Sequence, residues 1–549
     1  MAQFEELLRS EASRFWVRRR ARSLLHEALS EEQAGDLGSA EARCAASLTA
    51  WPAFAAGHLK MAQILRAGGA SEQASETPPQ NPCKYSSRAI RDVEFHLKQA
   101  LSATVSVPEE ERGNEEEGGV AQVATERLSL LLYQEGRDEE AAAILKRRGF
   151  RYRLSSDILR YPLPGAHPSE AVETTKPTRK RKNASSGTPS PESTRREGKN
   201  RRKRRRSTGN ENDVGKFVSA VDSALPLTML RHLQEVFGSQ SRFWSEHGYN
   251  SETGTPGYFS YIHSLDRPPE TSIEQVIGRV KALAEQRFPA VKEARFVEWW
   301  AHRRPHSSGH QLHFDSDNEG RGGIRNPIVS AVVYVTGDVG GPTLVTTQRL
   351  GSKRLADRGW IVHPRINRVC MFDGGVLHGV IPGRGVPPPL PREDVINVEG
   401  RQVAGGSGSD DSARVTWMVA FWRDIQARPR TLPLPSPLTP LASATPERTI
   451  PPTPSGAGAA QPFPYPSPPG RRKVKVKGTN PTWPTLFRKK PEGWGGSGEG
   501  ESEPETCPVT PVAVLRVWED VDGTENMRDG LGVRRLKRLP EYDLCFQGF

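Results

Sequence analysis

The spacing of apolar and polar positions divides the chain into five zones. Residues 1–156 are rich in Ala, Leu, Glu and Arg and repeat their apolar positions with the period of an α-helix, which predicts an all-α region. Short apolar runs separated by Gly- and Pro-containing turns fill residues 213–425 and predict strands. Residues 157–212 and 426–510 are polar or rich in Pro, Ser and Gly, and are predicted to be disordered. Apolar residues return in 511–549, so this C-terminal segment is a candidate for docking on the strand-rich domain.

The helical zone contains a repeat of about 34 residues. A turn glycine followed five positions later by a small residue occurs at Gly35 and Ala40 and again at Gly136 and Ala141. Small residues let two helices approach closely, and a glycine relieves backbone strain in the turn. The pattern resembles the tetratricopeptide repeat. That resemblance implies a concave surface for a peptide or protein partner; the alternative, which stays open, is a helical array that only packs against the next domain.

The strand-rich zone carries the strongest chemical signal. His313 and Asp315 form a His-x-Asp pair, and residues two apart in an extended segment project to the same face. A further histidine, His378, follows several predicted strands later. Arg414 and Thr416 then share one face of another predicted strand. Two histidines and one carboxylate on one face of Fe(II) form the 2-His-1-carboxylate arrangement of non-haem oxygenases.

This order of motifs over residues 213–425 resembles the 2-oxoglutarate- and Fe(II)-dependent dioxygenases, and within them the prolyl-hydroxylase-like branch. The resemblance implies a double-stranded β-helix, or jelly roll, with supporting helices. The predicted helices 225–237 and 273–287 lie where that branch has its supporting helices. The run Gly-Gly-Pro-Thr at 340–343 resembles the Gly-Gly-x-Thr turn of the same branch.

The resemblance also implies a role for each candidate residue. His313, Asp315 and His378 would bind Fe(II), and the 1-carboxylate and 2-oxo group of the cosubstrate 2-oxoglutarate would chelate the metal. Arg414 would hold the far carboxylate with its planar guanidinium, and Thr416 would donate a second hydrogen bond to that carboxylate. The implied reaction consumes O2, releases succinate and CO2 and hydroxylates a C–H bond. A requirement for ascorbate stays open.

Other residues compete for these roles. Arg384 and Arg392 follow His378 more closely than Arg414 does, but they lie in loop-like sequence. Residues 385–413 look like an inserted loop whose removal restores the family's usual spacing, and one use of such a loop is as a lid over the site. Asp317 is an alternative to Asp315.

For the other histidines and tryptophans singled out in this zone we expect structural positions rather than contacts with the metal or a substrate. Four histidines are expected on the surface or behind the ligands: His302, His306, His310 and His363. Trp299 and Trp300 are expected in the core rather than stacked on a substrate.

Charge and cysteine content indicate in which cellular compartment the protein is expected. Residues 176–206 hold 14 basic and two acidic residues, and their net charge of +12 equals that of all 549 residues. This stretch reads as a nuclear localisation signal, as a nucleic-acid tether or as a solvated linker. The five cysteines are scattered without a Cys-x-x-Cys pair, which favours a reducing compartment. With neither a secretory signal nor a run of about 18 apolar residues, we expect an intracellular protein, in the nucleus or cytoplasm, without a membrane partner.

Three functions follow from these observations. The resemblance favours hydroxylation of a protein or peptide that the helical repeats bind. A nucleic-acid oxidative demethylase is the second candidate, and it draws only on the basic linker. A non-catalytic repeat scaffold around an inactive jelly roll is the third.

Overall fold

The structure is a computed structural model of the chain. It describes residues 2–33, 36–68, 87–105, 115–147, 152–154, 156–161, 217–238, 241–247, 260–317, 325–350, 352, 356, 358–385, 413–425, 483–487, 504–513, 518–520, 527–528 and 534–535. No helix within these residues is both long and apolar enough to cross a lipid bilayer.

The N-terminal region is helical, as predicted; from α1 to α6 each helix packs against the next along the chain, and α7 packs against α5. Its elements are α1 (Ala2–Gln33), α2 (Leu37–Ala50), α3 (Ala55–Gly68), α4 (Ser87–Val105), α5 (Glu115–Gln134), α6 (Asp138–Arg147), β1 (Tyr152–Leu154) and α7 (Ser156–Leu159). The Asp36 side chain caps α2 by accepting a hydrogen bond from the backbone N–H of Ser39. Gly136 forms the turn between α5 and α6 at φ +81°, a conformation that glycine adopts without strain. The predicted turn glycine is therefore in place.

Two antiparallel sheets form the strand-rich region. The seven-stranded sheet contains, in order, β12 (Glu505–Cys507), β2 (Val218–Asp222), β9 (Val369–Asp373), β6 (Val329–Tyr334), β11 (Ala413–Trp422), β4 (Phe296–Pro305) and β3 (Tyr261–Ser264). The five-stranded sheet contains β13 (Thr510–Ala513), β8 (Arg358–Val362), β7 (Thr343–Arg349), β10 (Val376–Val380) and β5 (His310–His313). Two short pairs lie outside these sheets: β1 with β14 (Trp518–Asp520), and β15 (Met527–Arg528) with β16 (Arg534–Arg535).

The two sheets share a core between their inner faces. Val345, Trp360 and Val376 of the five-stranded sheet belong to the same buried cluster as the central strands of the seven-stranded sheet. Their sequence neighbours Leu344 and Leu377 belong to a different cluster. Since successive side chains of a strand point to opposite faces, these neighbours identify the outer face.

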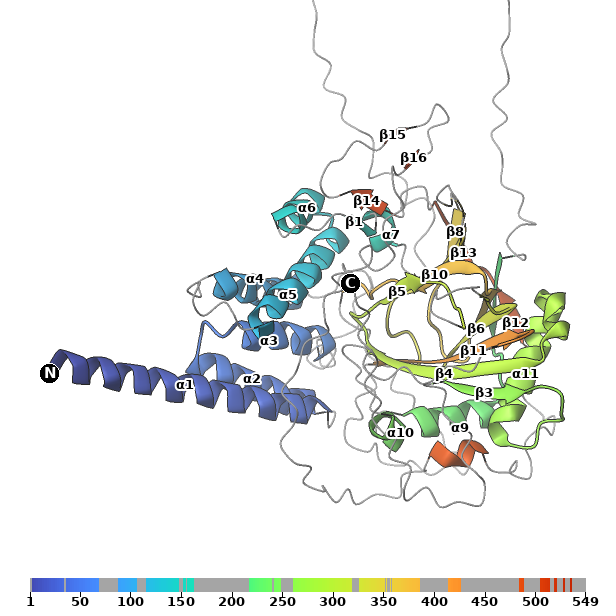
Figure 1. Cartoon of the computed structure of the whole chain (residues 1–549), viewed down its shortest axis with the longest axis horizontal. Coiled ribbons are helices and arrows are strands. Elements are labelled where there is room, and N and C mark those ends of the chain that lie inside the picture. The colour runs from blue at the N-terminus through green and yellow to red at the C-terminus, as the bar shows by residue number, and fades with distance from the viewer. Residues whose placement is uncertain are drawn as a thin grey trace, which may run out of the picture.

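Helices from residues 227–293 and 483–487 cover the outer face of the seven-stranded sheet. These elements are α9 (Leu227–Phe237), α10 (Arg242–Glu246), α11 (Ser272–Arg287), η3 (Pro289–Glu293) and η4 (Trp483–Phe487). Trp299 is fully buried there, in ring contact with Phe237 of α9 and Phe487 of η4. In Figure 1 the green helices α9, α10 and α11 flank β3 and β4 on the side away from β5 and β10. The predicted supporting helices are therefore present, and Trp299 is a core residue as expected.

The N-terminal helices cover the outer face of the five-stranded sheet. One buried cluster contains helical residues such as Leu131, Tyr133 and Tyr161 together with outer-face residues such as Leu344 and Leu377. In Figure 1 helix α5, which carries Leu131 and Tyr133, lies on the side of the sheets where β5 is. The helical region thus packs against the next domain, as one of the two sequence interpretations proposed.

Some stretches that we predicted to be disordered are ordered in part. The five residues of η4 lie within 426–510, and Leu486 and Phe487 are buried in the main core. Within the same stretch, β12 pairs with β2. At the start of the predicted linker 157–212, Tyr161 is buried between the helices and the sheet. The prediction of disorder is wrong for these pieces because their apolar residues meet surfaces that are distant in sequence.

A short part of the C-terminal region is paired with the strand-rich region. Thr510–Ala513 forms β13 and pairs with β8 of the five-stranded sheet. The basic stretch 176–206, most of the insert 385–413 and the last residues 546–549 lie outside the described residues.

Candidate metal centre

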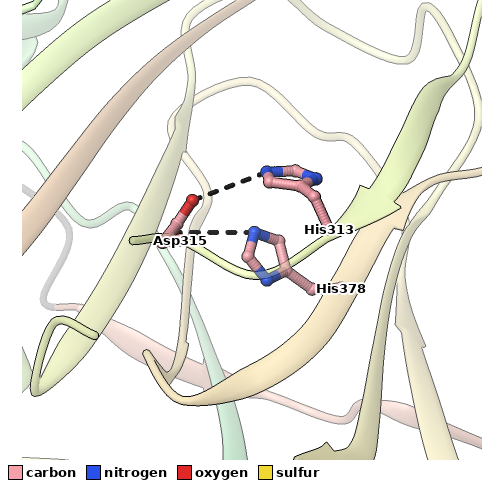
Figure 2. A group of neighbouring side chains, drawn as sticks. All are labelled: His313, Asp315 and His378. Carbon is pink, nitrogen blue, oxygen red and sulfur yellow. Dashed lines mark ion pairs between the residues drawn. The ribbon is translucent and has the colours of Figure 1, made fainter. Parts of the chain in front are cut away.

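Pairing of β5 with β10 brings the three predicted ligands together. His313 ends β5, and His378 lies directly opposite it on β10. Asp315 follows two residues after β5 and turns toward both imidazoles, as Figure 2 shows. One nitrogen or oxygen atom from each of the three residues lies within 4.8 Å of those of the other two. These atoms are close enough to be ligands of a single metal ion.

A β-bulge shapes this edge of the sheet. Val380 lies opposite His310 and His378 opposite His313, so two positions on β10 match three on β5. The extra residue lets His310 and His313 share one face, with ring centroids 4.7 Å apart. A side chain at Gly379 would meet the backbone of Leu312 at 2.9 Å, so this close approach requires glycine.

The distances within the group suit two imidazoles around a carboxylate. His313 Nε2 lies 3.5 Å from Asp315 Oδ1, and His378 Nε2 lies 3.6 Å from Asp315 Oδ2. Figure 2 draws both pairs as dashed lines. The Ser330 hydroxyl donates to Asp315 Oδ2 at 2.5 Å, and the Asn326 side-chain amide donates to the Asp315 backbone oxygen at 2.5 Å. These two donors fix the carboxylate and its backbone in place.

His378 is arranged as a metal ligand would be. Its Nδ1 lies 3.0 Å from the Val376 carbonyl oxygen, which requires the proton on Nδ1 and leaves a lone pair on Nε2. That Nε2 is buried and has no hydrogen-bond partner. An orphaned acceptor in a buried position is costly unless something binds it. A metal ion held by His313, Asp315 and His378 would satisfy it, so the residues present fit a metal.

The protonation states agree with this arrangement. Burial lowers the pKa of His378 to about 4, and the nearby Asp315 carboxylate opposes this only in part. Burial alone would raise the pKa of Asp315, but His378, His313 and the Ser330 hydroxyl hold it below its usual value. At neutral pH His378 is therefore neutral and Asp315 ionised, the forms in which both bind metals.

Asp317, the alternative carboxylate, has another partner. Its Oδ2 forms an ion pair with Arg325 Nε at 2.6 Å, and Arg325 also pairs with Asp424. Among the described residues, the cluster that could hold a metal contains Asp315 and not Asp317.

Arg414 and Thr416 lie on β11, next to the Gly-Gly turn. Both are buried, and Arg414 Nη1 donates to the Gly341 carbonyl oxygen at 3.2 Å. A side chain at Gly340, which has φ +88°, would meet Arg414 Cδ at 2.7 Å. The turn is therefore shaped around the arginine side chain. The structure places both candidates on the inner face, and their role in binding a carboxylate stays a prediction.

The rival arginines do not take this position. Arg384 turns toward the helical region, where its guanidinium donates to the backbone oxygens of Tyr161, Arg160 and Gln134. Arg392 lies outside the described residues.

The four remaining histidines are placed in different ways. His306 is buried behind the site, where it accepts from the Gly340 N–H and donates to the Arg384 oxygen. His363 makes a ring contact with Tyr161, away from the metal group. His302 and His310 lie nearer, with centroids 5.1 Å apart, and continue the line of imidazoles from His313. Burial, followed by the charges of Arg304 and Arg414, keeps the pKa of His302 well below its usual value.

Two inner-face residues were missed at the sequence level. Tyr334 lies opposite Thr416, is fully buried, and shares a 2.6 Å hydrogen bond with Thr343 Oγ1. Arg304 lies opposite Arg414 and is buried. Strand alternation is the signal that could have found both, because residues two apart in a strand share one face. Arg304 is two residues after His302, and Tyr334 is two residues before Thr336. Only the register of the strands connects them to Arg414 and Thr416.

Comparisons with known proteins add a structural likeness only. No protein-family model matches the chain, and no curated protein matches it. Among solved structures, HygX from Streptomyces hygroscopicus with iron bound is 12% identical at a TM-score of 0.20 and covers 38% of this chain and 83% of its own. SnoK, a non-heme alpha ketoglutarate dependent carbocyclase from nogalamycin biosynthesis, is 9% identical at a TM-score of 0.24, and the match covers 38% of this chain and 80% of SnoK. Because these TM-scores are low, the assignment below rests on this chain's own residues.

Proposed function

We propose that the chain is an Fe(II)- and 2-oxoglutarate-dependent dioxygenase. One observation carries the proposal: two histidines and one carboxylate converge on a point where the buried Nε2 of His378 lacks any hydrogen-bond partner. Two imidazoles and one carboxylate with open positions are the donor set of non-haem iron oxygenases. The packing of the five-stranded sheet that carries them against a second antiparallel sheet supports a double-stranded β-helix as the fold.

The protein's contribution to the metal is orientation. The Val376 carbonyl oxygen fixes the His378 ring, and Ser330 fixes the Asp315 carboxylate. Such outer hydrogen bonds hold ligands in the geometry that a metal requires. Exposure differs among the three side chains: His313 keeps 21%, whereas His378 and Asp315 keep 3% and 7%. We therefore place the approach of substrate on the His313 side.

The protein's contribution to the cosubstrate is a buried cation. Arg414 lies on the inner face with Thr416 beside it on the same strand and Tyr334 opposite Thr416 on β6. A guanidinium with neighbouring hydroxyls suits a carboxylate, which accepts two parallel N–H bonds. When bound, iron and 2-oxoglutarate supply the oxidising chemistry: O2 is consumed, succinate and CO2 leave, and a C–H bond is hydroxylated.

A protein or peptide is the substrate class that we propose. The resemblance of the motifs to the prolyl-hydroxylase-like branch supports this choice, and so does a helical region that resembles tetratricopeptide repeats. The face of the helices that contains Leu131 and Tyr133 packs on the sheet. A peptide would therefore bind elsewhere on the helical region or on the exposed side of His313. Entry into the nucleus through residues 176–206 stays a prediction that fusion to a reporter would test.

The test is a visible spectrum of the full chain with Fe(II) and 2-oxoglutarate in the absence of O2. Chelation of Fe(II) by the 2-oxo acid produces a charge-transfer band that the free components lack. We expect the band in the wild type, its loss in His378→Ala and its retention in the control His363→Ala, which removes an imidazole outside the metal group. A well-folded wild type without a band would contradict the proposal and favour the scaffold function.

A further inference from the structure

Two arginines lie side by side on the inner face. In the register of β4 and β11, Arg304 is directly opposite Arg414. Opposite residues of an antiparallel pair project to the same face, with Cβ atoms about 4.5–5.5 Å apart. Both side chains are buried, Arg304 with 8% and Arg414 with 3% exposure. Two buried arginines thus lie on the same face of neighbouring strands.

Arg304 has almost no compensation for its charge. Its Nη1 donates to the Gly309 carbonyl oxygen at 3.2 Å, and its buried Nε has no hydrogen-bond partner. No carboxylate of the described residues forms an ion pair with it.

Other arginines of the same domain are paired with aspartates. Arg368 pairs with Asp222, Arg325 with Asp317 and Arg349 with Asp373. A buried guanidinium without a carboxylate carries a large desolvation cost, which a bound anion would relieve. Arg304 differs from these three arginines, and a bound anion would compensate its buried charge.

The anion would bind on the inner face of the sheet, above the paired strands β4 and β11. Both guanidiniums reach toward the same end of the five-stranded sheet, since Arg414 bonds the Gly341 oxygen and Arg304 the Gly309 oxygen. Those two glycines both approach Pro382, one through its backbone and the other through its ring. One carboxylate offers about four lone-pair sites, enough for both arginines.

We propose that Arg304 and Arg414 together hold the far carboxylate of the cosubstrate, so that Arg304 is a second specificity-determining cation. The inference rests on the proposed function and deepens it. It predicts that the chain selects a dicarboxylic 2-oxo acid over a monocarboxylic one through two guanidiniums rather than one.

The test compares two acids that differ only in the far carboxylate. Full chain loaded with Fe(II) without O2 is titrated with 2-oxoglutarate and with 2-oxopentanoate, and the charge-transfer band gives a Kd for each. The Kd for 2-oxopentanoate divided by the Kd for 2-oxoglutarate measures recognition of the far carboxylate. We expect Arg304→Gln to reduce this ratio about 10- to 100-fold, the usual worth of hydrogen bonds to a charged group. Arg304→Lys keeps the charge without the planar fork, and it should reduce the ratio less.

The control is Arg303→Gln, which alters the neighbouring arginine on the opposite face of β4 and should leave the ratio unchanged. A wild type without a band at either acid would remove the proposed function itself. A wild-type band together with an unchanged ratio in Arg304→Gln would overturn only the inference. Equal weakening of both acids would also overturn it, because a merely structural role predicts that result. Thermal unfolding without ligand would identify a variant that does not fold, and Arg304→Lys would then decide.

Discussion

The two sheets are covered on their outer faces by different parts of the chain. Against the seven-stranded sheet lie α9, α11 and η4, all from residues 217–487. Against the five-stranded sheet lie helices from residues 55–161. The first arrangement is self-contained, whereas the second makes the N-terminal helices part of the fold that carries the metal group. A region that resembles a separate binding module is therefore also a structural cover.

The contact between helices and sheet is polar as well as apolar. Arg66 and Gln134 bond the backbone oxygens of Pro382 and Gly383, which directly follow β10 and its histidine. Gly383 in turn donates its N–H to the His306 oxygen, and the His306 ring accepts from Gly340 beside Arg414. A continuous set of hydrogen bonds thus runs from the helices to the proposed cosubstrate anchor.

Removal of residues 1–161 tests the comparison with the largest expected effect. It would expose the outer-face residues Leu312, Leu344, Ile361, Leu377 and Ile381. Burial of each such side chain contributes about 1.5–3 kcal/mol, so their loss rivals the whole stability of a domain. We expect aggregation on size-exclusion chromatography. The control lacks only residues 1–16, whose described side chains, 12–16, are exposed. A monodisperse truncated chain with an unchanged Tm would break the comparison.

Gly341→Ala should have the next largest effect. A methyl group there would lie 1.9 Å from the Ile381 oxygen, where the Gly-Gly turn meets the end of β10. We expect a loss of about 3 kcal/mol in the free energy of unfolding, measured with urea. The control is Gly278→Ala within α11, where nothing lies within 4 Å of the new methyl group. That change should stabilise the protein by about 0.5–1 kcal/mol. Equal effects of the two changes would contradict this account of the turn.

Gln134→Ala would weaken the polar contact between helices and sheet. It leaves Arg66 and the Pro382 oxygen with fewer partners in a buried place. We expect a loss of about 1–3 kcal/mol in urea unfolding. The control, Arg137→Ala, removes ion pairs to Glu140 and Glu94 near the surface, where solvent screening leaves them little effect on stability. A Gln134 effect no larger than that of the control would mean that this contact adds no stability.

A histidine pair inside the helical region should have the smallest effect. His58 and His96 face each other at 2.9 Å, and burial followed by the proximity of His58 lowers the pKa of His96 to about 4, which Asp92 partly opposes. As the pH falls, His96 of the unfolded chain takes up a proton near pH 6.5, whereas His96 of the folded chain does so only near pH 4. The free energy of unfolding therefore decreases as the pH falls from 6.5 toward 4. His96→Gln should reduce the fall in stability between pH 7 and 5 by about 1 kcal/mol after allowance for solvent screening. An unchanged pH dependence would contradict this.

The metal group could be predicted because its signals are local. His313 and Asp315 are two apart in an extended segment, and strand alternation is a property of the backbone itself. His378 could be added because its motif follows at the expected place in the order of strands. The position of His310 beside His313 could not be predicted, since it depends on a bulge in the pairing of β5 with β10.

The partners of buried surfaces could not be predicted either. The sequence around η4 is rich in proline, and Phe487 is buried through packing on Tyr261, His263 and Trp299, which are distant in sequence. The strands of the five-stranded sheet have apolar residues on both faces, as at Leu344 and Val345, which indicates burial on both sides but not which element covers them.

Two adjacent residues of β10 test the central claim most directly. Leu377 faces the helical region and His378 faces the metal group. We would prepare Leu377→Ala and His378→Ala in the full chain. Calorimetry would measure their affinity for Mn(II), used in place of Fe(II), and urea unfolding would measure their stability. We expect Leu377→Ala to lose about 2–5 kcal/mol of stability and to bind the metal as the wild type does. We expect His378→Ala to lose metal binding while its unfolding without metal changes little. Wild-type metal affinity in His378→Ala would contradict the account.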